Sequence, residues 1–200
     1  MEKRLDRPTG WRFTRHDRAV TELVLPDPSL VLLVGAAGAG KSTFAARHFT
    51  PSEVLSSDAL RAAVAGDEAN QAVSRIAFAM LFRELDRRLT AGVLTVVDAT
   101  NAARSHRTAL LRRAAEAGMP AVAIVLALPA AIVLGRNAGR GRHVDEEVVR
   151  RQLDGVAAAI ARGGLAVEGF ASVVVLRTPD DVAGVTVRRV PEMLRPPPTR

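Results

Sequence analysis

The chain has 200 residues, of which 48% are hydrophobic and 24% are charged, and this composition suits one globular domain and excludes an intrinsically disordered chain. It contains no cysteine, which excludes disulfides and thiolate catalysis and leads us to expect a reducing, cytoplasmic location. A formal net charge of +7 favours polyanionic partners, but 26 of the 28 basic residues are arginine, so part of this charge reflects compositional bias.

The first half of the chain predicts alternating strands and helices. Residues 1–20 are basic and have no hydrophobic period, so we expect a poorly ordered arm. Short apolar runs between turn signals predict strands, and apolar residues at helical spacing predict helices. The predicted elements are an edge strand at 21–25, a strand at Leu30–Val34, a helix at Lys41–His48, a strand at Val54–Ser56 and a helix at 69–91.

The second half continues the alternation. We predict, in order, a strand at 93–97, a helix at 104–117, a strand at 122–128, helices at 130–137 and 144–162, and a strand at 173–176. Residues 180–190 fit a helix or a strand, and 191–200 form a tail rich in Pro and Arg. The longest uncharged run, 117–135, is divided by Pro120 and Pro129, so no membrane helix is expected.

Strands that lack polar alternation, each followed by a helix, predict an α/β fold in which helices cover both faces of a five-stranded parallel sheet. Ligands of such sheets bind at the carboxyl ends of the strands. Gly35, Asp58 and Asp98 each follow or end a predicted strand. We therefore expect them to meet at one edge of the sheet.

The stretch GAAGAGKS matches the phosphate-binding P-loop pattern in full. Such a loop turns backbone N–H groups toward phosphates, and the helix that follows adds its positive end. The predicted nucleotide-binding residues are Gly35, Ala36, Ala37, Gly38, Ala39, Gly40, Lys41, Ser42 and Thr43. Lys41, one of two lysines in the chain, is expected to reach the β- and γ-phosphates of ATP, and Ser42 to bind Mg²⁺.

Asp58 lies just beyond a predicted strand, where a carboxylate can accept the proton of an attacking hydroxyl. Arg61 follows one helical turn later and is positioned to hold an anionic group of the acceptor. An alternative interpretation is that Asp58 caps a short helix and that Arg61 is solvated.

Asp98 ends an apolar strand and is predicted to bind near Mg²⁺, although it too fits a helix cap. The next residues bring no second carboxylate to activate water, which favours transfer over hydrolysis. Asn101 and Arg104, a few residues further on, are predicted to contact the substrate.

Arg136, Arg140 and Arg142 lie on a glycine-containing segment and are predicted to form a lid that stabilises charge on the transferred phosphoryl group. A solvated arginine face is the alternative. The four histidines have no metal-ligand spacing, so we expect surface positions for them.

These motifs, taken in order, resemble the kinase domain of bacterial polynucleotide kinases, in a group that also holds small-molecule kinases and zeta-type toxins. The resemblance rests on GAAGAGKST, SSDALR, GDEANQ, VVDATNAARSHR and RNAGRGR with EEVVRRQ, and it covers about Val20 to Val190. It implies ATP-dependent transfer to a 5′-hydroxyl end of DNA or RNA, with Asp58 as general base, Arg61 as acceptor clamp and Arg136 with Arg140 or Arg142 in the lid. The lid spacing R-G-R is one residue shorter than the R-P-x-R of that family, and the phosphatase and ligase-like domains of that family are not in this sequence.

We therefore expect a P-loop kinase domain over 21–190 that uses ATP and Mg²⁺. A kinase of a small hydroxylated metabolite or antibiotic is the first alternative. A regulatory module that binds ATP without turnover is the second.

Overall fold

A computed structural model describes residues 22–60, 71–141 and 143–192. Five parallel strands form the central sheet, in the order β3-β4-β2-β5-β6. The P-loop strand is therefore the middle one, paired with β5 along its whole length and with β4 from Leu30 to Leu33. The strands are β2 (Leu30–Val34), β3 (Val54–Ser56), β4 (Thr95–Asp98), β5 (Ala121–Leu126) and β6 (Ser172–Leu176).

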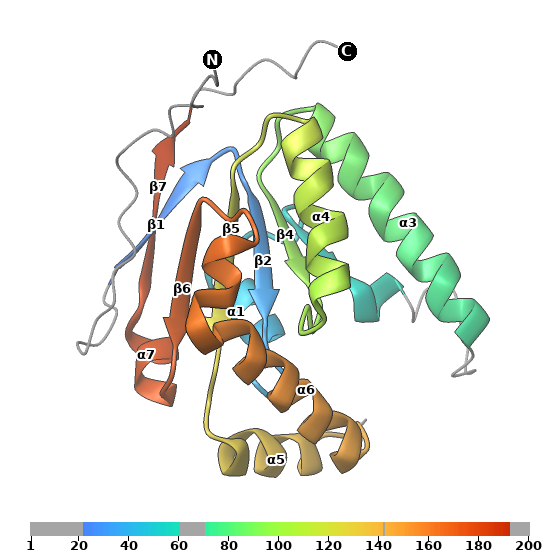
Figure 1. Cartoon of the computed structure of the whole chain (residues 1–200), viewed down its shortest axis with the longest axis vertical. Helices are drawn as coiled ribbons and strands as arrows, with labels where there is room; N and C mark the ends of the chain where they lie inside the picture. The colour runs from blue at the N-terminus through green and yellow to red at the C-terminus, as the bar shows by residue number, and fades with distance from the viewer. Residues whose placement is uncertain (1–21, 61–70, 142, 193–200) are drawn as a thin grey trace, which may run out of the picture.

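The prediction of an α/β fold with a five-stranded parallel sheet is confirmed (Figure 1). The helices are α1 (Lys41–His48), α3 (Gln71–Thr90), α4 (Arg104–Glu116), α5 (Ala130–Ala138), α6 (Glu146–Ile160), the 3-10 helix η1 (Ala161–Val167) and α7 (Pro179–Gly184). A further helical turn begins at Ser57 and is described as far as Leu60.

The sheet separates two apolar cores, because successive side chains of a strand point to opposite faces. Leu30 and Leu32 of β2 pack with residues of α3, α4 and the end of α6, whereas Val31 and Leu33 pack with residues of α1, α5 and strand β1 (Glu22–Asp27). All four leucine and valine side chains are fully buried. Buried on both faces, β2 holds the residues that follow it at a fixed place in the molecule.

Three sequence predictions are corrected. The strand predicted at 21–25 is β1 (Glu22–Asp27), which pairs in parallel with β7 (Thr186–Pro191) in a separate two-stranded sheet. Residues 180–190 were predicted to form either a helix or a strand, and the structure has both, since α7 is followed by β7. The strand predicted at 93–97 is β4, which begins at Thr95 rather than Val93 and, as predicted for that residue, ends at Asp98.

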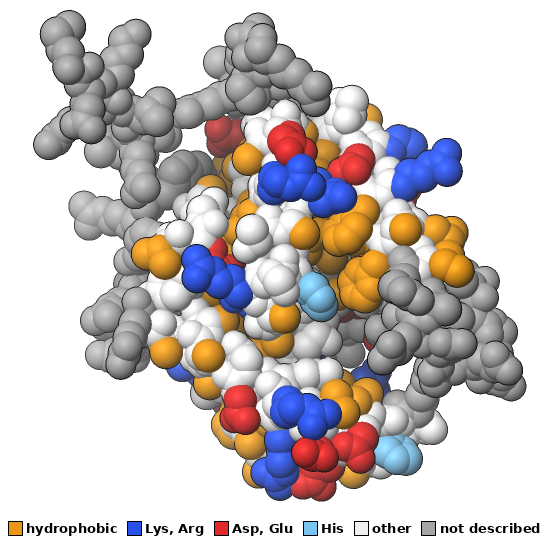
Figure 2. Space-filling view, turned by 45° about the vertical axis from the view of Figure 1, so that its right-hand side comes forward, with side chains coloured by type: hydrophobic (Ala, Val, Ile, Leu, Met, Phe, Trp, Pro, Cys, Tyr) orange, Lys and Arg blue, Asp and Glu red, His pale blue; other side chains and the backbone are white. Residues whose placement is uncertain are grey.

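Basic and acidic side chains lie interspersed on one face of the described part of the molecule (Figure 2). On the face drawn in Figure 2, arginine side chains lie scattered among acidic ones. Helix α6 has i,i+4 pairs of Arg150 with Glu146 and of Arg151 with Glu147. Within the described ranges, none of the helices combines the length and the apolar character that a bilayer span requires.

Candidate active site

The residues between β2 and α1 form a tight loop whose shape depends on glycine. Gly38 and Gly40 have φ angles of 89° and 93°, a region that favours glycine. Gly40 is the N-cap of α1 and leaves the cap without a side-chain hydrogen bond. The N–H groups at the start of α1 therefore face the cleft with no capping side chain, as an anion site at a helix N-terminus requires.

Lys41 is the buried charge of this loop. Its Nζ donates a hydrogen bond to the carbonyl oxygen of Ala36 at 3.0 Å, and its residue exposure is 9%. Burial lowers the pKa of Lys41, the carboxylates of Asp98 and Asp58 act in the opposite direction, and the positive charge of Arg140 lowers it further. These four residues come from separate segments of the chain and line the same cleft.

Asp98 and Asp58 are not helix caps. The N-cap of α4 is Ala103, which makes no side-chain hydrogen bond, and Asp98 is a buried residue at the end of β4. The turn that contains Asp58 is capped by Ser56, whose Oγ accepts a hydrogen bond from the Ala59 N–H at 3.2 Å. The capping alternatives raised for the two aspartates are therefore wrong.

Helix α5 brings the predicted lid against the phosphate loop. Arg136 lies in its last turn and Arg140 follows it. A Cβ built on Gly40 would lie 3.7 Å from Nη1 of Arg136, which places this guanidinium beside the loop. Both arginines line the same cleft as Lys41, whereas Arg142, like Arg61, lies outside the described residues.

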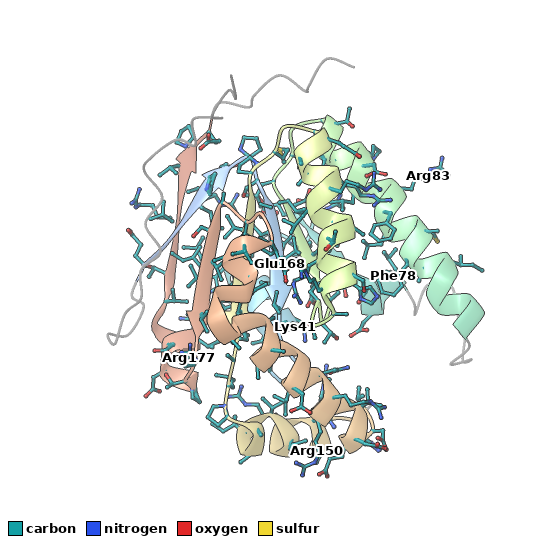
Figure 3. All side chains as sticks on the ribbon, viewed as in Figure 1. Lys41, Phe78, Arg83, Arg150, Glu168 and Arg177 are labelled. Atoms are coloured by element: carbon teal, nitrogen blue, oxygen red, sulfur yellow. The ribbon has the colours of Figure 1, made fainter. Side chains whose placement is uncertain are left out.

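The cleft has a volume of about 980 Å³ and opens at the carboxyl end of the sheet, around Lys41 (Figure 3). Most predicted site residues line it, namely Ala37, Gly38, Gly40, Lys41, Ser42, Thr43, Asp58, Asp98, Arg136 and Arg140. The remaining loop residues Gly35, Ala36 and Ala39 support it from behind, and Ala36 and Ala39 are buried.

Sequence reasoning missed several lining residues. His143 and Gln152 reach the cleft from the lid side, and Pro179, Val182 and Ala183 give it an apolar wall from α7. Oε1 of Gln152 accepts a hydrogen bond from the N–H of Ala37 at 2.8 Å. The run EEVVRRQ contains Gln152, but nothing in the sequence indicates that its amide meets a residue 115 positions away.

Two residues that were predicted to contact the substrate have other partners in the structure. Asn101 is buried, and its Nδ2 donates to the carbonyl oxygens of Leu33 at 2.8 Å and Val97 at 3.4 Å. This geometry favours a positioning role over the predicted contact with substrate. Arg104 is exposed outside the lining of the cleft, with Nε 3.9 Å from a carboxylate oxygen of Glu168.

The donor set suits Mg²⁺. The Ser42 hydroxyl and the Asp98 carboxylate both line the cleft, and both are the hard oxygen ligands that this ion prefers. The described residues hold no cluster of three or more His, Cys, Asp or Glu for a metal. Mg²⁺ at nucleotide sites takes one or two protein ligands and completes its shell with phosphate oxygens and water, so the residues present fit.

Comparison with known proteins places this geometry in a family. The model of a family described as AAA domain, AAA_33, matches residues 30–162. No curated protein matches the chain. The chain is similar to a chain in the structure of the Pnkp1/Rnl/Hen1 RNA repair complex, at a TM-score of 0.58 and 22% identity, over 67% of this chain and 45% of that one.

Two other solved structures are covered over most of their length. A sugar kinase from Janibacter sp. HTCC2649 aligns at a TM-score of 0.51 and 22% identity, over 75% of this chain and 85% of that one. Kti12 from Chaetomium thermophilum, in complex with ADP-AlF3, aligns at 0.54 and 19% identity, over 78% and 92%. At these identities the likeness is one of fold.

Proposed function

The chain belongs to the AAA_33 family of AAA domains, and we propose that it is an ATP-dependent phosphotransferase that moves the γ-phosphate to a hydroxyl acceptor. One observation carries this proposal. The buried Lys41 lines one cleft together with Asp98, Asp58 and Arg140, and these four residues come from four separate segments of the chain. Phosphoryl transfer uses a phosphate-binding cation, a metal ligand, a base and an arginine that stabilises the transferred group, and these four residues are candidates for those parts.

The proposed reaction is an in-line displacement. An oxygen of the acceptor hydroxyl forms a bond to the γ-phosphorus while the bond from that phosphorus to the β-phosphate oxygen breaks. Asp58 takes the hydroxyl proton, and ADP leaves with the electron pair of the broken bond. Lys41, Arg136 and Arg140 stabilise the negative charge on the phosphate oxygens, and Ser42 and Asp98 would hold Mg²⁺, which neutralises charge on the nucleotide.

The preferred acceptor is the 5′-hydroxyl end of DNA or RNA. Three observations support this acceptor. The net charge is +7, and the chain is similar to a chain of an RNA repair complex. Asp58 is also exposed, at the mouth of the cleft. The chain spans 45% of the length of that relative, so similarity in fold does not by itself assign that relative's substrate to this chain.

A small hydroxylated molecule is the second candidate acceptor. The alignment with a sugar kinase over 85% of its length favours it, as does the mixture of charges on the face in Figure 2. Regulation by ATP binding without transfer is the remaining alternative.

Substitution of Asp58 tests the mechanism. D58A should lower transfer of labelled γ-phosphate from ATP by about 10²–10⁴-fold, because a positioned general base contributes that much. ADP binding, measured by calorimetry, should stay within about threefold, since phosphates meet the loop and not Asp58. D154A, an exposed aspartate on α6, is the matched control. Full transfer by D58A to every acceptor tested would show that Asp58 is not the base.

Salt separates the two acceptor classes. The assay uses a 5′-OH DNA oligonucleotide, a matching RNA and a pool of hydroxylated metabolites at 50 mM and 200 mM salt. A polynucleotide acceptor should bind much more weakly at the higher concentration, because counterions compete for its phosphates. A neutral metabolite should bind equally well at both. Label in the metabolite pool alone would replace the polynucleotide, and label in no acceptor would favour the regulatory alternative.

A further inference from the structure

A buried ion pair lies behind the candidate active site and takes no part in the chemistry proposed above. Arg107 of α4 and Glu168, which follows η1, have side-chain exposures of 2% and 5%. Nε and Nη2 of Arg107 donate to the two carboxylate oxygens of Glu168 at 2.7 and 2.6 Å. Removing two charges from water is costly, so a buried pair of this kind is weak evidence for stability and invites another explanation.

The other donor of Arg107 reaches the turn that follows Asp98. Nη1 donates to the carbonyl oxygens of Asn101 at 2.8 Å and Ala102 at 2.6 Å. One planar guanidinium therefore ties Glu168 to two successive carbonyls of this turn. An ammonium group cannot reproduce that arrangement, because it lacks the fixed fork of donors.

The same turn is joined to the phosphate loop. Asn101 has a φ of 48°, unusual for a residue other than glycine, and its amide donates to the carbonyl of Leu33 at the end of β2. One residue earlier, the carbonyl of Thr100 accepts a hydrogen bond from the N–H of Gly35 at 3.0 Å. The backbone around Asp98 is thus fixed directly to the first residue of the phosphate loop.

Helix α6 confines the turn from another side. A Cβ built on Gly155 would lie 3.3 Å from the Cβ of Ala102, so the helix approaches the turn closely at a glycine. Figure 3 shows Glu168 labelled between α6 and α4, near the centre of the molecule. The turn is therefore held by Arg107, by Gly155 and by the phosphate loop at once.

We propose that Arg107 and Glu168 are positioning residues for the metal and phosphate site. They fix the distance between the Asp98 carboxylate and the hydroxyl of Ser42 by holding the turn after β4 against the phosphate loop. This inference rests on the proposed function, since it assigns Asp98 and Ser42 to Mg²⁺. Mutation of residues that orient metal ligands in this way typically lowers metal affinity about 10–100-fold.

The test measures binding of ADP with and without Mg²⁺ by calorimetry, on the full chain, for R107K and E168Q. R107K keeps the charge and loses the fork, whereas E168Q keeps the shape and loses the charge. We expect the Mg²⁺ concentration needed for half of the metal-dependent gain in ADP affinity to rise about 10–100-fold. ADP affinity without Mg²⁺ should stay within about threefold. If R107K does not fold, E168Q carries the test.

Arg113 provides the matched control on the same helix. Its guanidinium lies 4.1 Å from the centre of the Phe82 ring and its Nε 3.1 Å from Asp86, on the side of α4 that faces α3. R113K should lower the melting temperature without changing the Mg²⁺ dependence of ADP binding, as a purely structural role predicts. An equal shift in R113K and R107K would overturn the positioning role.

The outcomes separate this inference from the proposed function. An unchanged Mg²⁺ dependence in both R107K and E168Q, while the natural protein transfers phosphate, overturns the positioning role alone. A natural protein that binds Mg²⁺ with ADP but transfers no phosphate overturns the proposed function, and the binding data still decide the role of Arg107. ADP binding that is independent of Mg²⁺ in the natural protein overturns the metal role of Asp98, and this inference with it.

Discussion

At the scale of single residues, Gly38 is the position where backbone geometry limits function most sharply. Its φ is 89°, and a Cβ there would run into the carbonyl oxygen of Val133 and approach the backbone N and Cβ of Asn137 at 3.2 Å. We predict that G38A weakens ADP binding at least about tenfold, because a left-handed residue costs ~1–2 kcal/mol and α5 must move as well. Calorimetric titration with ADP and a thermal melt measure the two effects.

Gly135 is the control for this change, because it lies in α5, the helix that Gly38 contacts, and has open space around it. A Cβ at Gly135 meets no atom within 4 Å. G135A should raise the free energy of unfolding by about 0.4–1 kcal/mol, since alanine restricts the unfolded chain, and should leave ADP binding unchanged. ADP binding by G38A at the level of the natural protein would contradict the role of Gly38.

At the scale of elements, α6 connects the lid to the phosphate loop. Its first turn is capped by Asp145, and its residue Gln152 accepts the N–H of Ala37. We predict that Q152A weakens ADP binding about fivefold, because one hydrogen bond that orders the loop is worth ~1 kcal/mol. Q152E should weaken binding further, since a carboxylate would stand beside the phosphates.

Arg151, the neighbour of Gln152 on α6, is the control for this helix. It is exposed and pairs with Glu147 one turn earlier, so R151A removes an arginine without touching the loop. R151A should bind ADP as the natural protein does, within about twofold. Equal affinities in Q152A and R151A would show that the contact between Gln152 and Ala37 does not order the loop.

Helices and strands that follow from local sequence patterns were predicted well. The bounds of β2, α1 and β3 were correct to the residue, because apolar runs between turn signals and a P-loop are local patterns. The pairing of β1 with β7 was not predicted, since it joins segments about 160 residues apart that carry no mutual signal.

The residues of the candidate site also divide into those predicted from local patterns and those missed because their partners are distant in the sequence. Lys41 was predicted from the P-loop pattern, and Asp58 and Asp98 from their places at the ends of predicted strands, and all three line the cleft. Gln152 and Glu168 were missed, because their partners lie 115 and 61 positions away. Asn101 was assigned to the substrate, since a polar residue after a strand end looks the same whether it faces the cleft or the backbone.

At the scale of the whole molecule, one ion pair ties the second small sheet to the main one. Arg189 of β7 donates from Nη1 and Nη2 to Glu53, just before β3, at 2.6 and 3.0 Å. We predict that R189Q lowers the free energy of unfolding by about 1 kcal/mol at neutral pH. The bidentate geometry places this pair at the upper end of the range for partly exposed pairs.

This contribution should depend on pH with a definite sign. The hydrogen bonds from Arg189 lower the pKa of Glu53 from 4.5 against the opposing effect of burial. A carboxyl group whose pKa is depressed by folding stabilises the protein fully above its unfolded pKa and loses that contribution as the pH falls through its folded pKa. Urea unfolding of R189Q and the natural protein between pH 7 and pH 3 should therefore give a difference in free energy of unfolding that is constant above about pH 5 and shrinks below it.

R188Q, which breaks an exposed pair with Glu22, is the control and should show a smaller difference in free energy of unfolding throughout. A difference for R189Q that does not change with pH would mean that Arg189 acts through its packing over the Phe49 ring and not through Glu53.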